Sequence, residues 1–201
     1  MNQMPQYLAA TDIINHQQQD VRKLALKLAQ ADSEATAKSC FEWVRDNVRH
    51  SSDYKLNPVT CRASAVLEHR TGYCFAKSHL LAALLRANSI PTGFCYQRLS
   101  LFDDGAPYTL HGFNAIYLDR HGWYRVDARG NKPGVDAQFT PPQEQLAYAI
   151  NFAEELDCEH IFAEPLPIVV SALQSYATWD EMLRNLPDVE REDFPQLISQ
   201  I

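Results

Sequence analysis

Apolar residues recur every three to four positions in two stretches near the start of the chain, at residues 19–30 and 33–48. This spacing gathers them on one face of a helix and predicts two amphipathic helices. A third stretch, from Cys74 to the Ile-Pro-Thr-Gly sequence at 90–93, is apolar around most of its girth. A helix of that kind is typical of a protein interior. We therefore expect it to be the central helix of the domain.

Beyond residue 91 the hydrophobic period changes from about 3.6 to 2, which predicts β-strands. The expected strands are residues 92–101, 111–118 and 123–128. A loop with Asp-Gly and Pro signals joins the first two, and the turn Asp-Arg-His-Gly joins the second and third. Connections this short imply antiparallel pairing. One buried helix followed by an antiparallel sheet predicts an α+β fold, with further helices at both ends.

Two regions flank this core. The Gln-rich residues 1–18 are expected to be a loosely ordered lead-in. Residues 141–201 look helical, starting at two prolines where a helix tolerates them, and no Gly/Ser linker separates them from the sheet. We therefore predict a core at residues 1–140, including the N-terminal helices, and a helical extension at 141–201 packed on it. The expected buried stripe of the extension is Val169, Val170, Leu173 and Tyr176.

The composition narrows the function classes. A net charge of −7 argues against non-specific binding to nucleic acid or to an anionic membrane surface. No stretch approaches the roughly 18 apolar residues that span a bilayer. The N-terminus lacks a basic segment followed by a long apolar core, so a cytoplasmic location is expected. The chain has 5 cysteines, an odd number without a Cys-x-x-Cys pair, so neither a disulfide framework nor a zinc ribbon is expected.

Cys74 stands where a Gly-Tyr-Cys turn enters the central helix. Unpaired backbone N–H groups and the positive end of the helix dipole meet at a helix N-terminus, which favours a thiolate there. A structural cysteine would be more at home in the middle of such a helix, so we hypothesise a nucleophile. Cys40 lies beside the apolar stripe of the second helix, and Cys61 lies in the first turn of a short helix ending near Arg70. We interpret both as structural thiols.

A thiol nucleophile needs a base, and that base needs a group to orient it. His111 begins the second predicted strand and Asp127 ends the third. If the loop Asp119–His121 has three residues, Leu118 pairs with Gly122 and the two side chains share one face of the sheet. A four-residue loop would send them to opposite faces. We predict the three-residue loop or a compensating bulge.

These motifs together resemble those of the transglutaminase-like superfamily, which shares a papain-like fold. Gly72-Tyr73-Cys74, the helix behind it and its Ile-Pro stop are similar to the family's cysteine motif. His111 before an aromatic-containing strand, and the run Trp123–Asp127, resemble its histidine and aspartate motifs. The similarity covers roughly Asn57 to Gly134. One departure is Gly112-Phe113-Asn114, where the family often has a tryptophan.

The resemblance implies acyl transfer or hydrolysis through a thioester, either transglutaminase-like or cysteine protease-like. It implies Cys74 as nucleophile, His111 as base and later acid, and Asp127 as the residue that orients the histidine. The substrate would be a peptide, a protein or a small amide, and the acyl acceptor an amine or water. The backbone N–H of Cys74 is the default oxyanion donor, with a side chain before the cysteine motif as a second candidate.

Two other interpretations stay open. A catalytically inactive member of the family would keep these residues for stability or use the groove for binding. Alternatively, Cys74, Cys95, His79 and His111 are plausible metal ligands. Their spacing gives no compact pair, however, and His79 lies about 140° around the helix from Cys74, so we interpret it as a surface or packing histidine. We expect no metal or other cofactor, and the calcium used by some transglutaminases has no loop motif here.

Overall fold

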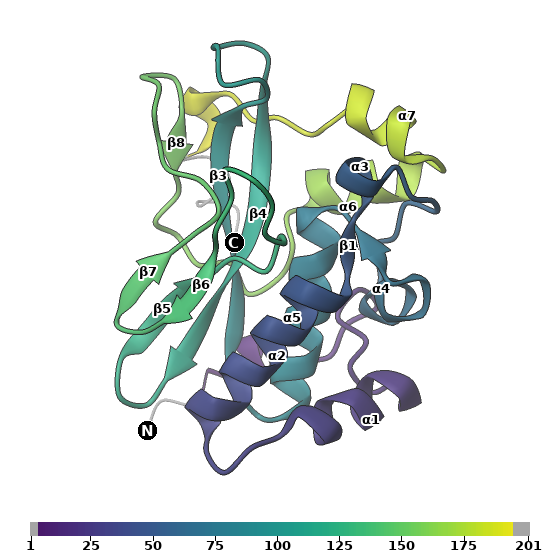
Figure 1. Ribbon diagram of the computed structural model, residues 1–201, viewed down its shortest axis with the longest axis vertical. Helices are drawn as coiled ribbons and strands as arrows, with labels where there is room; N and C mark the ends of the chain where they lie inside the picture. The colour runs from purple at the N-terminus through teal and green to yellow at the C-terminus, as the bar shows by residue number, and fades with distance from the viewer. Residues whose placement is uncertain (1–3, 195–201) are drawn as a thin grey trace.

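The long apolar stretch of the sequence forms the helix α5, Cys74–Ala87. In the computed structural model, which describes residues 4–194, every residue of this helix from Cys74 to Arg86 is buried. It lies between the sheet and the other N-terminal helices (Figure 1), in contact with both. The prediction of a central helix is therefore confirmed. The position follows from its composition, because a helix that is apolar all round is stable only when covered on every side.

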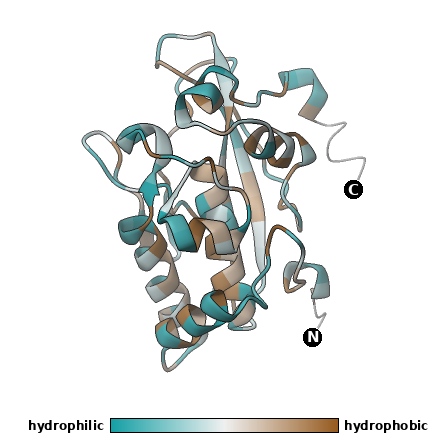
Figure 2. Cartoon of the chain, turned by 90° about the vertical axis from the view of Figure 1, so that its right-hand side faces the viewer, coloured by the Kyte–Doolittle hydropathy of each residue, from teal (hydrophilic) through white to brown (hydrophobic). Residues whose placement is uncertain are grey.

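A curved antiparallel sheet packs against α5, and the predicted α+β class is confirmed. The sheet has the strand order β5-β4-β3-β8, and each neighbouring pair is antiparallel. Figure 1 shows the α-helices on one side of this sheet, and Figure 2 views the molecule from that side. The long hairpin β3–β4 forms its centre, so its residues face α5 on one side and later chain segments on the other. The strands are β3 Thr92–Ser100, β4 Tyr108–Leu118, β5 Gly122–Val126 and β8 Leu156–Asp157.

The other N-terminal elements surround α5. Two short strands pair in parallel and bring His50 opposite Gly72, two residues before Cys74. The second helix is capped by Asp32, whose side chain accepts a hydrogen bond from the Ala35 N–H at 2.8 Å. The elements are α1 Gln19–Leu28, α2 Ser33–Asn47, β1 Arg49–His50, α3 Ser51–Tyr54, α4 Ala63–His69 and β2 Thr71–Gly72.

The described part of the N-terminal lead-in, residues 4–18, is better ordered than the sequence suggests. It begins with the 3₁₀ helix η1, Pro5–Tyr7, and Ile14 is fully buried in the core. The Tyr7 hydroxyl donates to the carbonyl of Ile161 at 2.9 Å. The expectation of a loose segment was therefore wrong here, because its apolar residues find partners far away in the sequence. Residues 1–3 lie outside the described part.

The predicted helix over residues 141–156 does not form. Instead β6 and β7 make a small hairpin, followed by a loop and β8. Tertiary contacts hold this segment extended: the Tyr124 hydroxyl donates to the carbonyl of Gln143 at 3.2 Å and accepts from the Thr140 N–H at 2.9 Å. Arg125 pairs with both Glu144 and Asp157. The two hairpin strands are β6 Gln138–Thr140 and β7 Gln143–Gln145.

Helices do follow further along, as predicted. They are α6 Pro167–Ser175 and α7 Trp179–Arg184, and the short 3₁₀ helix η2 is Arg191–Asp193. In the predicted stripe, Val169 and Leu173 are buried, while Val170 and Tyr176 are partly buried against the same core. This core also contains residues of α5, so the extension shares its hydrophobic cluster. The boundary at residue 140 stays a prediction. Within residues 4–194, no helix combines the length and apolar character that crossing a membrane requires.

Candidate active site

Cys74 is the first residue of α5, directly after the N-cap Tyr73. Its approach is fixed by the Thr60 hydroxyl, which donates to the carbonyl of Thr71 at 2.8 Å. A side chain at Gly72 would meet the Ala76 Cβ at 3.1 Å, so the chain passes close to the helix at this point. Cys74 retains 8% exposure. The thiol therefore sits at the positive end of the most buried helix, yet still reaches the surface.

The hairpin β4–β5 brings His111 and Asp127 together. Leu118 pairs with Gly122, so the loop has three residues and the predicted register is confirmed. His111 lies in β4 and Asp127 directly follows β5, on the same face. The His111 Nε2 is 2.6 Å from the Asp127 Oδ2, and the two side chains are 6% and 1% exposed. Such a short contact between buried groups is typical of a charge-assisted hydrogen bond.

Asp127 accepts two further hydrogen bonds from backbone donors. The N–H of Arg129 lies 3.0 Å from Oδ1, and the N–H of Ala147 lies 3.2 Å from Oδ2. Burial alone would raise the pKa of this carboxyl group, but the charge of His111 and these hydrogen bonds outweigh it, so the pKa is lowered. Asp127 is therefore held as a carboxylate with a fixed orientation.

His111 also interacts with Cys74. Burial, the largest single effect, lowers the pKa of His111, but the charges of Asp127 and Cys74 and the hydrogen bond to Asp127 raise it to about 10. Because Asp127 engages Nε2, the remaining ring nitrogen, Nδ1, is the one left for the thiol. The structure thus brings together all three candidate residues of the sequence. Their catalytic roles stay a prediction.

The raised pKa of His111 predicts a pH dependence of stability. The folded state binds its proton more tightly than the unfolded state, whose histidine has a pKa near 6.5. The stabilisation is thus complete below about pH 6.5 and is lost as the pH rises through about 10. We expect the free energy of unfolding to fall more steeply with pH in the wild type than in His111→Gln, measured by urea titration from pH 6 to 10. Parallel pH profiles of the two proteins would contradict the pairing.

Sequence reasoning missed the segment that covers this centre. The ring of Tyr148 lies edge-on to His111 with centroids 5.0 Å apart, next to Ala147. The Arg129 guanidinium stands 5.7 Å from the centre of the Tyr148 ring. Burial raises the pKa of Tyr148 to about 12, so it is a neutral phenol at ordinary pH. No local signal marks these residues, because residues 141–156 carry a helix-like pattern.

Cys40, Cys61, Cys95 and His79 are buried and pack inside the protein. His79 is fully buried with Nδ1 2.8 Å from the carbonyl of Cys61, which agrees with a packing role. Burial raises the pKa of Cys40 to about 12 and that of Cys61 to about 11, and it also raises the pKa of Cys95. These three thiols are therefore poor nucleophiles. Within residues 4–194, no three His, Cys, Asp or Glu side chains gather in a way that could hold a metal ion.

We compared the chain with protein families, with curated proteins and with solved structures. The family model of the transglutaminase-like superfamily matches residues 22–128. No curated protein matches in sequence. A candidate cysteine protease from Cytophaga hutchinsonii has a TM-score of 0.51 and 20% identity, over 64% of this chain and 43% of that one. The periplasmic domain of TgpA from Pseudomonas aeruginosa has a TM-score of 0.42 and 20% identity, over 63% of this chain and 48% of that one. The chain therefore spans less than half of either structure.

Proposed function

Because the chain belongs to the transglutaminase-like superfamily, we propose that it carries out thiol-dependent acyl transfer or hydrolysis through a thioester on Cys74. The observation that carries this proposal is the 2.6 Å contact between His111 Nε2 and Asp127 Oδ2, beside a cysteine at the N-terminus of a buried helix. Fold stability alone requires none of these three residue types at these positions. The substrate we propose is a peptide, a protein or a small amide.

The proposed first half-reaction forms the thioester. Cys74 and His111 react as a thiolate–imidazolium pair, with Asp127 fixing the ring through Nε2 so that Nδ1 is left for the sulfur. The Sγ attacks the amide carbonyl carbon, and the electron pair of the carbonyl bond moves to its oxygen. The backbone N–H of Cys74 is the proposed donor to this oxyanion. His111 then gives its proton to the departing amine as the carbon–nitrogen bond breaks.

The second half-reaction returns the enzyme to its starting state. Neutral His111 takes a proton from the acceptor, which is water in hydrolysis or an amine in acyl transfer. The acceptor attacks the thioester carbonyl, the carbon–sulfur bond breaks, and the thiolate–imidazolium pair forms again. Throughout, Asp127 stays ionised, and its two backbone hydrogen bonds keep it in place.

A trapping experiment tests this proposal. The wild type is incubated with amide donors, including peptides that contain glutamine, quenched in acid, and analysed by mass spectrometry. We expect a covalent adduct on Cys74 that hydroxylamine releases, because a thioester reacts with that nucleophile, and no adduct in Cys74→Ala. The variant Cys61→Ala serves as a control, since Cys61 lies beside His79 and burial raises its pKa to about 11. Failure of every donor to form an adduct would favour the catalytically inactive binding module.

A further inference from the structure

A pocket of about 560 Å³ adjoins the candidate active site. Its walls come from the end of α2, from β1 and α3, from the first turns of α5, and from the loop that follows Asp127. Five cationic side chains and two carboxylates line it, although the whole chain carries a net charge of −7. The cationic residues are Arg45, Arg49, Lys77, Arg129 and Lys132, and the carboxylates are Asp46 and Asp53.

Lys77 lies deepest in this pocket, one helical turn beyond Cys74. Its side chain is fully buried, and its Nζ donates to the carbonyls of Val48 and Arg45. Within residues 4–194, no carboxylate lies within ion-pair distance of it. A Cβ at Gly130 would come to 3.2 Å from Nζ, so this wall stays open only because the residue is glycine. Burial, followed by the charge of Arg129, lowers the pKa of Lys77 to about 7.

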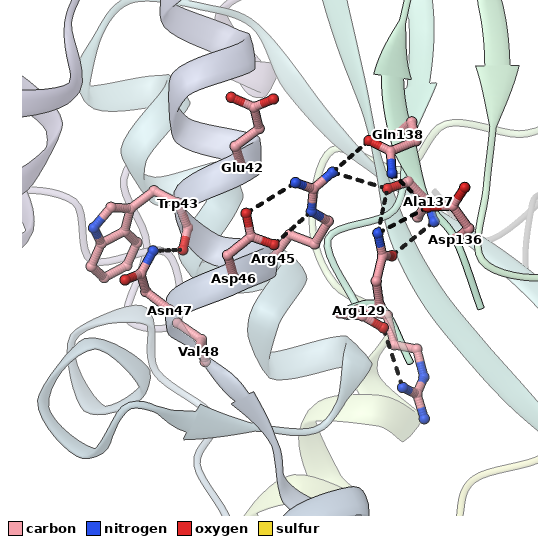
Figure 3. Close-up of polar contacts among 12 residues, drawn as sticks. Glu42, Trp43, Arg45, Asp46, Asn47, Val48, Arg129, Asp136, Ala137 and Gln138 are labelled. Atoms are coloured by element: carbon pink, nitrogen blue, oxygen red, sulfur yellow. Dashed lines mark hydrogen bonds and ion pairs between the residues drawn. The ribbon is translucent and has the colours of Figure 1, made fainter. Parts of the chain in front are cut away.

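The two carboxylates are already engaged. Arg45 forms a two-pronged contact with Asp46, at 2.7 and 2.9 Å, as Figure 3 shows. Asp53 is shared: it accepts two hydrogen bonds from Arg129, at 2.6 and 3.0 Å, and one from Lys132 at 2.8 Å.

Arg49 completes the cationic lining at the exposed edge of the pocket. Its guanidinium stands 5.3 Å from the centre of the Tyr54 ring, and the structure pairs it with no carboxylate in residues 4–194. Positive charge in the pocket therefore exceeds the negative charge available to it, and a bound anion would relieve this imbalance.

Arg129 connects the wall of the pocket to the proposed catalytic centre. Arg129 follows Asp127 by two residues and donates its backbone N–H to that carboxylate. Its guanidinium faces both Asp53 in the pocket and the ring of Tyr148, which covers His111. Burial, the largest effect, lowers the pKa of Arg129, but the hydrogen bonds to Asp53 and the charges of Tyr148, Asp53 and Cys74 raise it overall. Because Arg129 contacts both the pocket and the residues around His111, we expect a peptide whose carbonyl lies at Cys74 to extend into the pocket.

We infer that this pocket binds a side-chain carboxylate of the acyl donor, so that the preferred substrates are acidic peptides. This inference rests on the proposed function, because the bound peptide is a substrate only if Cys74 forms a thioester with it. The guanidinium of Arg49 and the ammonium group of Lys132 supply the donors that a carboxylate needs. Arg49 and Lys132 at the exposed edge bind the carboxylate, while the buried charges of Lys77 and Arg129 behind them add to the positive potential.

The test measures binding without chemistry. In the full chain carrying Cys74→Ala, fluorescence anisotropy compares two labelled heptapeptides with a central glutamine, one with flanking glutamates and one with glutamines in their place. We expect the acidic peptide to bind at least about tenfold more tightly. The double variant Arg49→Gln/Lys132→Gln should lose most of this preference. A matched double variant on the exposed face of α1, Arg22→Gln/Lys27→Gln, should keep it.

Each outcome bears on the inference. Equal affinity for the two peptides would overturn it, and so would an equal loss in the matched α1 variant. Binding of inorganic phosphate without binding of the acidic peptide would show a site for free anions, which also overturns it. Incubating the wild type with the same acidic peptide separates this inference from the proposed function. Preferential binding of the acidic peptide without a thioester supports the pocket and refutes the proposed catalysis. A thioester formed equally well by both peptides supports the catalysis and refutes the pocket.

Discussion

Replacing His111 by alanine is expected to slow the alkylation of Cys74 at pH 5.5 by two to three orders of magnitude, roughly. In the wild type, the pKa of His111 is raised to about 10, so its ring stays protonated beside the sulfur throughout pH 5–8. Without that ring, only about one ordinary thiol in a thousand is ionised at pH 5.5. The measurement is the rate at which iodoacetamide labels Cys74 between pH 5 and 8, followed by mass spectrometry.

The matched control for this experiment is His121→Ala. His121 lies in the β4–β5 turn, where its ring is 3.4 Å from Glu34 and 22% exposed. We expect its removal to leave the labelling rate of Cys74 unchanged. If wild-type Cys74 reacts no faster than a model thiol across this pH range, the thiolate–imidazolium pair does not exist. The binding-module interpretation would then be the better one.

Replacing Asp127 by alanine is expected to lower the free energy of unfolding by about 3–5 kcal/mol. The change leaves the protonated ring of His111 buried without its partner, and it removes the acceptor of the Arg129 and Ala147 N–H groups. Asp127→Asn keeps an oxygen acceptor and should cost less stability. It still removes the charge that raises the pKa of His111, so the alkylation of Cys74 should fall at low pH as it does in His111→Ala.

Asp157→Asn provides the comparison for the stability measurement. Asp157 also pairs with an arginine, Arg125, but its side chain is 29% exposed and Arg125 keeps Glu144 as a second partner. Partly exposed ion pairs contribute about 1 kcal/mol or less, so urea denaturation should show little change for this variant. An Asp127→Ala protein as stable as Asp157→Asn would contradict the three-donor arrangement around Asp127.

The β4–β5 hairpin shows how much of the site can be predicted from the local sequence. The turn residues limit the loop to a few lengths, and the alternation of side chains along a strand then leaves two choices of face. Three residues in the loop put His111 and Asp127 on one face, as predicted. The position of the central helix could be predicted equally well, because a helix that is apolar around most of its surface is stable only when it is buried. The predicted family membership is confirmed by the match over residues 22–128.

The sequence by itself determined the central helix and the hairpin that puts His111 and Asp127 on one face. Only the tertiary structure decided that residues 141–157 form two short strands joined by a loop instead of a helix, and hence that Ala147 and Tyr148 complete the site. It also decided that the end of α2, β1, α3 and the loop after Asp127 enclose a cationic pocket. Periodicity depends on neighbours within a few positions along the chain. These features instead depend on hydrogen bonds and charges between residues up to about eighty positions apart, such as Asp53 and Lys132, which no local pattern encodes.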